Sequence, residues 1–311
     1  MLEKAAFFEN YPIEERFHLS GFSWEELEAI YDDYTDSEEE LQDTAKELNR
    51  LFSENSIKGK HSVRYRCKNG EHLIEKIIRN ATNNTAGSSV AKYKMINRTN
   101  YKKLITDLIG IRILVLTKED WEGVHDFIMA RFQNIKERYL QYWEDDYGYV
   151  DDPDAMWIVE PPVAYVRYGD SDIFKGKLEP KYTHKDYRSQ HYIVKYKNVY
   201  CEIQVRTLAE EVYGEFDHSI RYPYHENNRF LKKYTAMLSK ITVATDSILS
   251  LCKGLPDEML ESCGNYFEEE VYPEFNAVFK HDNPSERANW GTQNILEASN
   301  MNLERRIRPN V

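Results

Sequence analysis

The chain has 311 residues, of which 41% are apolar, and a formal net charge of −12. This length and apolar content exclude a wholly disordered protein and suit one large domain or two small ones. No apolar run reaches the roughly 18 residues of a membrane span, and the first residues are acidic where a secretory signal would be apolar. We therefore expect a cytoplasmic protein without a membrane partner.

The acidic charge is concentrated at the start of the chain. Residues 1–55 contain sixteen Asp and Glu against four Lys and Arg, so the remaining residues sum to zero. Within this segment, residues 23–52 have apolar residues at helical spacing and a Ser23/Glu26 capping box, which predicts a long acidic helix or a helix pair. Its charges are expected to form a solvated outer face, with a basic partner as the alternative.

A basic stretch follows. Seven Lys and Arg lie between Lys58 and Arg79, where HSVRYRCK alternates as a strand does and GEHLIEKIIRN has a helical pattern. Arg66 and Lys68 then point together from the strand, and Lys76 lies on the helix with Arg79. Phosphate is expected here, although surface strands also carry Lys and Arg for solubility.

TDLIGIRILVL (residues 106–116) predicts a central strand that is apolar on both faces, with Asp107 at its leading edge. An Asp at a strand start is commonly a cap or turn residue. KEDWEGVHDFIMARFQNIKERYLQYW (residues 118–143) predicts an amphipathic helix. PPVAYVRYGD (residues 161–170) predicts either a strand that lines a site or a hairpin packed on the core.

The segment CEIQVRTLAEEVYGEFDH (residues 201–218) places a carboxylate, an amide and a guanidinium on alternate residues. Glu202, Gln204 and Arg206 therefore share one face of a predicted strand, and the residues between them point into an apolar layer. A capping box of Thr207 and Glu210 then starts a helix. The polar row suits phosphate chemistry or forms a solvated face.

Four motifs together resemble the synthetase domain of the RelA/SpoT family, which transfers a pyrophosphoryl group from ATP to a ribose 3′-hydroxyl. They are TDLIGIRI, YRSQH, EIQVRT and HSVRYRCKNGEHLIEKIIR, in the family's order. The resemblance implies an α+β fold, a nucleotidyltransferase-like mixed β-sheet flanked by helices, with an N-terminal acidic helix and a C-terminal helical extension. The predicted divisions are 1–57, 58–225 and 226–311.

The resemblance also implies roles for individual residues. Asp107 and Glu202 would hold Mg²⁺, with Glu202 alternatively taking the proton of the attacking hydroxyl, and Arg112 would steady the site. Oxygen ligands of this kind suit Mg²⁺ and would make a poor zinc site. The residues expected to grip ATP are Arg66, Lys68, Lys76 and Arg79.

The acceptor side of the implied site is less well defined. Tyr187 would stack on the acceptor's purine, His191 would lie near its phosphates, and Gln204 and Arg206 would bind it as well. Stacking discriminates weakly among bases, so it does not name the acceptor. Many family members have Gly before this Tyr, whereas this chain has Asp186, which leaves the acceptor open.

Residues 228–270 predict further helices. The dipeptide His281–Asp282 suggests a metal phosphohydrolase, but that site needs additional His and Asp ligands and a preceding helical domain, so we expect synthesis without hydrolysis. The four cysteines form no CxxC pair and are expected to be reduced thiols; they are Cys67, Cys201, Cys252 and Cys263.

Three functional hypotheses follow. The first is an alarmone synthetase that uses ATP, Mg²⁺ and GDP or GTP to make (p)ppGpp. The second is a toxin of the same chemistry that pyrophosphorylates the 3′ end of tRNA and is restrained by an antitoxin, or an enzyme that makes (p)ppApp. The third is a non-catalytic nucleotide sensor or scaffold. Whether the chain forms a homo-oligomer stays open.

Overall fold

The computed structural model describes residues 2–83, 87–134, 156–167, 171–174, 176–182, 187–197, 199–221, 225 and 228–256. Its contacts divide the chain into two compact units, residues 1–253 and residues 254–311. The division into three parts made from the sequence stays a prediction.

Four helices lead into the sheet: α1 (Lys4–Asn10), α2 (Glu14–Ser20), α3 (Trp24–Asp36) and α4 (Glu38–Glu54). The acidic segment is therefore a helix pair, α3 and α4, preceded by two short helices. The predicted capping box is confirmed, because Ser23 Oγ accepts from Glu26 N at 3.2 Å and Ser23 N donates to the Glu26 carboxylate at 2.9 Å.

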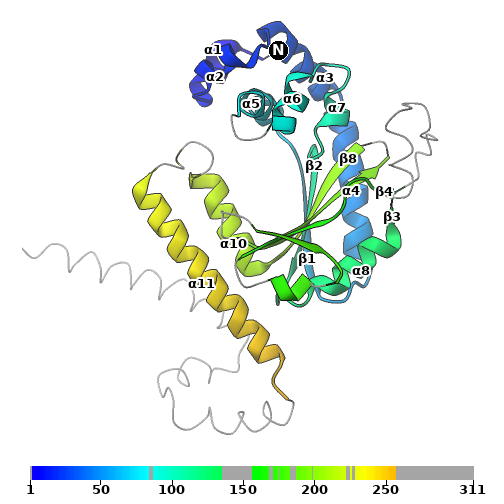
Figure 1. Cartoon of the computed structure of the whole chain (residues 1–311). Coiled ribbons are helices and arrows are strands. Elements are labelled where there is room, and N and C mark those ends of the chain that lie inside the picture. Colours follow the sequence, from blue (N-terminus) through cyan, green and yellow to red (C-terminus); the bar gives the residue numbers. More distant parts are fainter. Residues whose placement is uncertain are drawn as a thin grey trace, which may run out of the picture. The chain divides into compact units, whose positions relative to one another are not determined.

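Among the described residues, eight strands form one mixed sheet with the order β1-β2-β8-β7-β4-β3, and β5 joins β7 to β6 (Figure 1). Strands β2 and β8 are parallel, whereas β1 pairs with β2, and β7 with β8, in antiparallel fashion. Their bounds are β1 (Lys60–Cys67), β2 (Ile109–Val115), β3 (Gln133–Asn134), β4 (Trp157–Ile158), β5 (Val163–Val166), β6 (Glu179–Tyr182), β7 (Ser189–Tyr196) and β8 (Val199–Thr207).

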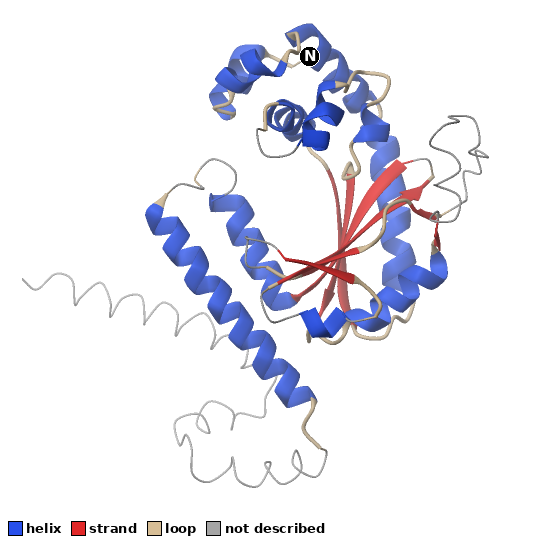
Figure 2. Cartoon of the chain, viewed as in Figure 1, coloured by secondary structure: helices blue, strands red, loops and turns tan. Residues whose placement is uncertain are grey.

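The two faces of the sheet differ in polarity. One face buries the alternate apolar residues of β2 and β8, such as Ile111 and Ile203, against α4 and α8 (Trp121–Arg131). On the other face lie Arg112 and Glu202, and α10 (Leu208–Phe216) packs there (Figure 2). The prediction of a central strand is confirmed, since β2 lies between β1 and β8, and Ile111 and Leu114 are buried on opposite faces; Arg112 is the polar exception.

Helix α5 (Gly70–Ala81) follows β1 as predicted, and Asn69 caps its first turn by accepting from the backbone N–H of Glu71 and His72. Two further helices, α6 (Gly87–Lys94) and α7 (Tyr101–Leu104), lead to β2. The predicted helix of residues 118–143 is shorter in the structure and ends at Arg131. Gln133 and Asn134 instead pair with β4, and sheet pairing outweighs helical spacing there. Residues 135–155 lie outside the described residues.

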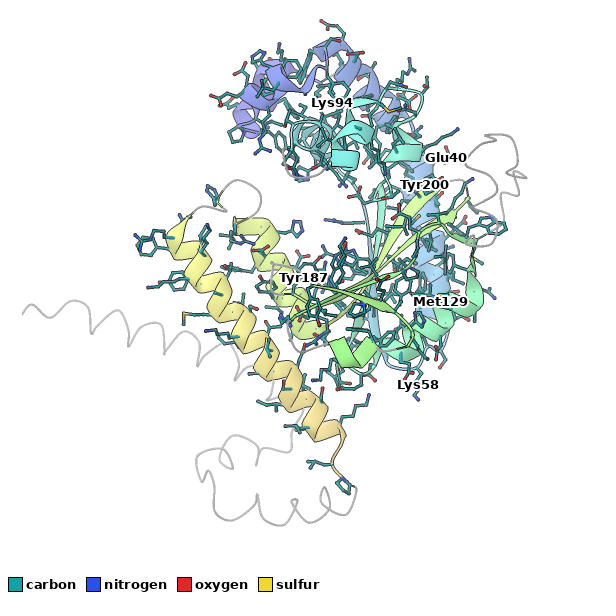
Figure 3. The ribbon with its side chains drawn as sticks, viewed as in Figure 1. Glu40, Lys58, Lys94, Met129, Tyr187 and Tyr200 are labelled. Atoms are coloured by element: carbon teal, nitrogen blue, oxygen red, sulfur yellow. The ribbon has the colours of Figure 1, made fainter. Side chains whose placement is uncertain are left out.

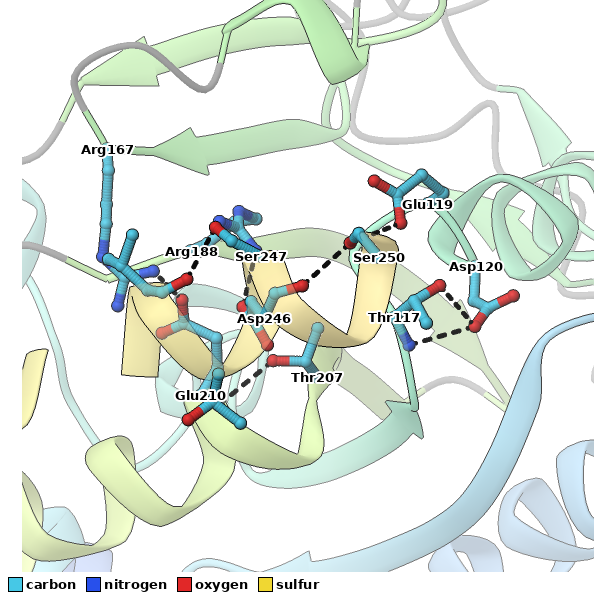
Figure 4. A network of polar contacts seen from close by, with 12 residues as sticks. Thr117, Glu119, Asp120, Arg167, Arg188, Thr207, Glu210, Asp246, Ser247 and Ser250 are labelled. Atoms are coloured by element: carbon cyan, nitrogen blue, oxygen red, sulfur yellow. Dashed lines mark hydrogen bonds and ion pairs between the residues drawn. The ribbon is translucent and has the colours of Figure 1, made fainter. Parts of the chain in front are cut away.

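A 3-10 turn, η1 (Ser171–Phe174), precedes β6, and a π-helical turn, η2 (Asp217–Arg221), follows α10. The first helix predicted within residues 228–270 is confirmed as α11 (Arg229–Lys253), which packs on α10. The second predicted helix lies outside the described residues. Figure 4 shows the contacts beneath α11, where the Arg188 guanidinium meets the Asp246 carboxylate at 2.7 Å. Both side chains are buried, so this ion pair joins α11 to the sheet.

Candidate active site

Strand register brings the polar residues of four strands onto one face. Arg66 of β1 lies opposite Gly110 of β2, which in turn lies opposite Glu202 of β8. Two residues along, Arg112 lies opposite Gln204, and Gln204 lies opposite His191 of β7. Directly paired residues point to the same side of a sheet, so chain segments distant in sequence share this surface. The polar row predicted on β8 is thus confirmed as part of a wider polar face.

Asp107 lies just before β2, between two lysines. Its carboxylate is 2.9 Å from Lys68 Nζ and 2.7 Å from Lys76 Nζ. Burial alone would raise the pKa of Asp107, but the charges of Lys76 and Lys68 outweigh it and hold the pKa well below the usual range. Asp107 is therefore an anion at neutral pH, and two ammonium groups accompany it.

The other two residues expected to grip ATP lie differently. Arg79 forms an ion pair with Glu75 on its own helix, with Nε and Oε1 2.8 Å apart. Arg66 is exposed on the polar face of β1. The structure therefore joins Lys68 and Lys76 directly to Asp107, and it holds Arg79 through a neighbouring carboxylate.

Glu202 is the second carboxylate of the polar face. Its Oε1 lies 3.0 Å from His191 Nδ1, and its Oε2 accepts from Gln204 Nε2 at 2.7 Å. Burial opposes ionisation, but the His191 contact and the Gln204 hydrogen bond outweigh it and lower the pKa of Glu202 to about 2. The other nitrogen of His191, Nε2, is buried and has no hydrogen-bond partner among the described residues.

Arg206, which was predicted to bind the acceptor, is buried on the polar face. Its guanidinium donates to Gln204 Oε1 at 2.6 Å and to Ser189 Oγ at 3.2 Å, and it lies 3.5 Å from the Glu211 carboxylate. Burial and the nearby charge of Arg112 lower the pKa of Arg206 below its ordinary value. Arg206 is thus a buried guanidinium whose fork is held in place by hydrogen bonds to Gln204 and Ser189.

The structure also brings Tyr187 to this face, as Figure 3 shows on the side of the sheet that α10 occupies. The Arg206 guanidinium carbon lies 5.9 Å from the centre of the Tyr187 ring, within cation–π range. Tyr165 was not predicted as a site residue, yet its ring centre is 5.8 Å from that of Tyr187 and 4.7 Å from that of His191. Its alternation within the predicted strand of residues 161–170 was the available signal. Asp186 lies outside the described residues.

Two glutamates of α10 were also missed. Arg112 Nη1 donates to Glu211 Oε1 at 2.8 Å and forms a second ion pair with Glu215. The spacing of four residues places both carboxylates on one helix face, which is a signal the sequence does contain. Arg112 therefore has its charge balanced by α10, at one end of the polar face.

Asp107 and Glu202 are the carboxylates that suit a cation. The charge of Asp107 acts on the ionisation of Glu202, the pKa of each carboxyl lies below its usual range, and both supply hard oxygen ligands of the kind that Mg²⁺ prefers. No cluster of three or more His, Cys, Asp or Glu side chains able to hold a metal occurs within the described ranges. A cation at these two carboxylates would thus take its remaining ligands from water and substrate.

The family model for the region found in RelA / SpoT proteins matches residues 65–227, which is more than half of the chain. The chain belongs to the RelA/SpoT family. Its match includes the end of β1 and all of β2, β7, β8 and α10, the elements that carry the polar face. His281 and Asp282 lie outside both this match and the described residues.

Solved structures resemble this RelA/SpoT chain at low identity. A GTP pyrophosphokinase family protein from Streptococcus pneumoniae is 19% identical, with 84% of this chain and 97% of that one covered and a TM-score of 0.42. The small alarmone synthetase 1 from Bacillus subtilis is 21% identical, with 74% and 95% covered and a TM-score of 0.44. A search of curated proteins found no match. In the part of the chain that is described, no helix is long and apolar enough to cross a membrane.

Proposed function

We propose that this RelA/SpoT chain transfers pyrophosphate from ATP to the 3′-hydroxyl of GDP or GTP and so makes (p)ppGpp, with Mg²⁺ as cofactor. The single observation that carries the proposal is the meeting, on one sheet face, of two ionised carboxylates with Arg66, Lys68 and Arg206. Cations of this kind bind polyphosphate, and the carboxylates suit the metal that accompanies it.

The reaction exchanges one phosphate linkage for another. The 3′-hydroxyl oxygen of the acceptor bonds to the β-phosphorus of ATP, the bond from that phosphorus to the α,β-bridging oxygen breaks, and AMP leaves. The hydroxyl proton passes to solvent or to a neighbouring base. Positioning and neutralisation of charge supply most of the acceleration in transfers of this type.

Different side chains of the polar face would supply the positioning and the neutralisation of charge. Mg²⁺ held by Asp107 and Glu202 would supply charge neutralisation at the phosphates. Lys68 and Lys76 are flexible point charges that can turn from Asp107 to phosphate oxygens. A carboxylate whose pKa is about 2 is a weak base, so we assign Glu202 to the cation rather than to the proton.

The acceptor would occupy the other end of the face. Tyr187 offers a ring for stacking on a base, and Arg206 beside it offers a charged fork for phosphate. His191 Nε2, which has no hydrogen-bond partner among the described residues, adds a hydrogen-bonding group beside Tyr165, whose ring lies next to that of Tyr187. These groups recognise a stacked nucleotide, and none of them distinguishes guanine from adenine.

The test supplies ATP labelled on its β- and γ-phosphates, with Mg²⁺ and GDP, GTP, ATP or deacylated tRNA as separate acceptors. We expect the label to appear on the guanine nucleotides and to require the metal, so that excess EDTA stops the transfer. Label on tRNA alone would establish the toxin, label on ATP alone would establish (p)ppApp synthesis, and no transfer to any acceptor would favour the sensor or scaffold.

The role of Asp107 in the transfer is tested with the variant Asp107→Asn. We expect at least about a hundredfold loss of transfer, because the variant lacks the charge that holds the cation and pairs the lysines. Asp43→Asn is the matched control, since Asp43 is exposed on α4 and pairs only with Lys46 among the contacts described. Retention of full activity by Asp107→Asn, with its helical circular dichroism unchanged, would remove Asp107 from the mechanism.

A further inference from the structure

Helix α11 turns its apolar side outward. Six large apolar side chains along it are between 58% and 72% exposed: Phe230, Tyr234, Met237, Ile241, Ile248 and Leu251. The residues that α11 buries are small or polar, namely Thr235, Ser239, Thr242 and Asp246. An amphipathic helix ordinarily buries its apolar stripe, and a contiguous exposed stripe on a soluble protein marks an interaction surface.

The spacing of this exposed stripe is that of a coiled coil. Its members alternate at intervals of four and three residues, with Ala244 occupying the position between Ile241 and Ile248. This is a strict seven-residue repeat over three heptads, and a period of 3.5 keeps a narrow seam facing a second helix. We call these seven residues the α11 seam. Its occupant is therefore another helix.

The types of residue in the α11 seam favour two parallel helices. Position a holds Tyr234, Ile241 and Ile248, and position d holds Phe230, Met237, Ala244 and Leu251. Isoleucine at a with leucine-like residues at d is the combination of two-stranded parallel coiled coils.

Charges beside the α11 seam point to the same arrangement. Lys233 and Lys240 take position g on one flank, whereas Leu231 and Leu238 take position e on the other. In a parallel pair of identical helices, each g faces an e of the second copy, so the lysine stems cover apolar or uncharged side chains. An antiparallel pair would set the lysines of the two g flanks against each other.

The body of the protein leaves the α11 seam clear. Thr235 and Thr242 occupy position b, and Ser239 and Asp246 occupy position f, which are outer positions in a coiled coil. Helix α10 packs against α11. The buried ion pair of Asp246 with Arg188 (Figure 4) restrains the rotation of α11 about its own axis, and the large apolar side chains of the α11 seam are exposed.

We propose that α11 is a dimerisation helix, and that two copies of this chain pair through the α11 seam as a parallel two-stranded coiled coil. A second copy supplies the same apolar seam. In the parallel direction, its uncharged e positions face the lysines at the g positions of the first copy. The proposal concerns assembly and does not rest on the pyrophosphate transfer proposed above.

Sedimentation equilibrium of the full chain measures the mass of the assembly in solution. We expect twice the 36.9 kDa of one chain at micromolar concentration. Ile241→Glu places a charge in the α11 seam and should raise the dissociation constant at least about tenfold. Ala236→Glu adds the same charge to the same helix at an exposed outer position and should remain dimeric. A monomer at every concentration, or a dimer unaffected by Ile241→Glu, would overturn the proposal.

Cross-linking tests the direction. Leu251→Cys is placed in a chain that also carries Cys252→Ser and Cys263→Ser, and the latter two changes alone form the control. Parallel helices bring both copies of position 251 together, so mild oxidation should give a covalent dimer with Leu251→Cys and none with the control. A noncovalent dimer that fails to cross-link at position 251 would exclude the parallel α11 seam. Unchanged far-ultraviolet circular dichroism of the Ile241→Glu protein confirms that the exposed substitution leaves the fold intact.

Discussion

At the scale of single residues, the polar face depends on carboxylates that stay ionised although they are buried. Asp107 does so beside Lys68 and Lys76, and Glu202 does so beside His191 and Gln204. The cost of removing each charge from water is offset by partners within hydrogen-bonding distance. Removal of one partner would leave a buried charge uncompensated, so each of these residues affects stability as well as activity.

The low pKa of Glu202 makes a prediction for acid stability. Its pKa falls from 4.5 in the unfolded chain to about 2 in the folded protein, so its ionised form stabilises the fold above pH 4.5. This stabilisation declines as the pH falls from 4.5 to about 2, and it is lost below the pKa of Glu202 in the folded protein. We expect the free energy of unfolding lost in Glu202→Gln to be about 1 kcal/mol smaller at pH 3.5 than at pH 7. Urea titrations at both values measure it.

The comparison for this experiment is Glu54→Gln, because Glu54 is exposed at the end of α4. That variant should show the same pH dependence as the unchanged protein. A Glu202→Gln variant whose loss of stability is equal at both pH values would contradict the ionised, hydrogen-bonded state assigned to Glu202.

At the scale of elements, α10 fits closely over Arg206. A Cβ added at Gly214 would lie 2.6 Å from Arg206 Nη1, so α10 has glycine where the guanidinium passes. Gly214→Ala favours the helix by about 1 kcal/mol in propensity but displaces the guanidinium from Gln204 and Glu211. The substitution therefore favours the helix and at the same time moves the guanidinium away from its partners.

We expect Gly214→Ala to raise the KM for the acceptor about tenfold, because hydrogen bonds of a charged group are disturbed, while the KM for ATP is unchanged. Steady-state kinetics with each substrate varied in turn measure this. Val212→Ala serves as the control on the same helix, since Val212 is exposed. Equal acceptor KM values for Gly214→Ala and the unchanged protein would show that Arg206 does not contact the acceptor.

At the scale of the whole molecule, the N-terminal helices share a core with the sheet. One cluster of buried apolar side chains extends from Leu2 to Val205 and includes Phe7 of α1. The Phe7 ring contacts those of Tyr11 and Trp24, with centres 4.9 and 5.5 Å apart. The acidic N-terminal helices are therefore part of the folded unit that carries the site.

Phe7→Ala tests this continuity. We expect a loss of about 3 kcal/mol in the free energy of unfolding, since truncation leaves a cavity in a shared core. The hydrogen-exchange protection of β8 amides should fall by the same amount. Leu19→Ala, at a side chain that is 74% exposed, should change neither quantity by more than about 0.5 kcal/mol. Unchanged protection of β8 in Phe7→Ala would mean that the N-terminal helices unfold on their own.

Local patterns were sufficient for much of this protein. The strand and helix of the basic stretch, the Ser23 cap and the alternating row on β8 all depend on neighbours within a few residues, and the structure confirms them. The RelA/SpoT family was recognisable because its motifs are short and occur in order. The polar residues of the site were named for the same reason.

Only the tertiary structure decided how those residues pair. The ion pairs of Asp107 with two lysines join β1, α5 and the start of β2, and the contact of Tyr165 with His191 depends on β5 pairing with β7. The end of α8 at Arg131 was likewise decided by strand pairing with β4. The physical reason is that local spacing records which face a side chain takes, whereas its partners are chosen by strand register and packing between distant segments.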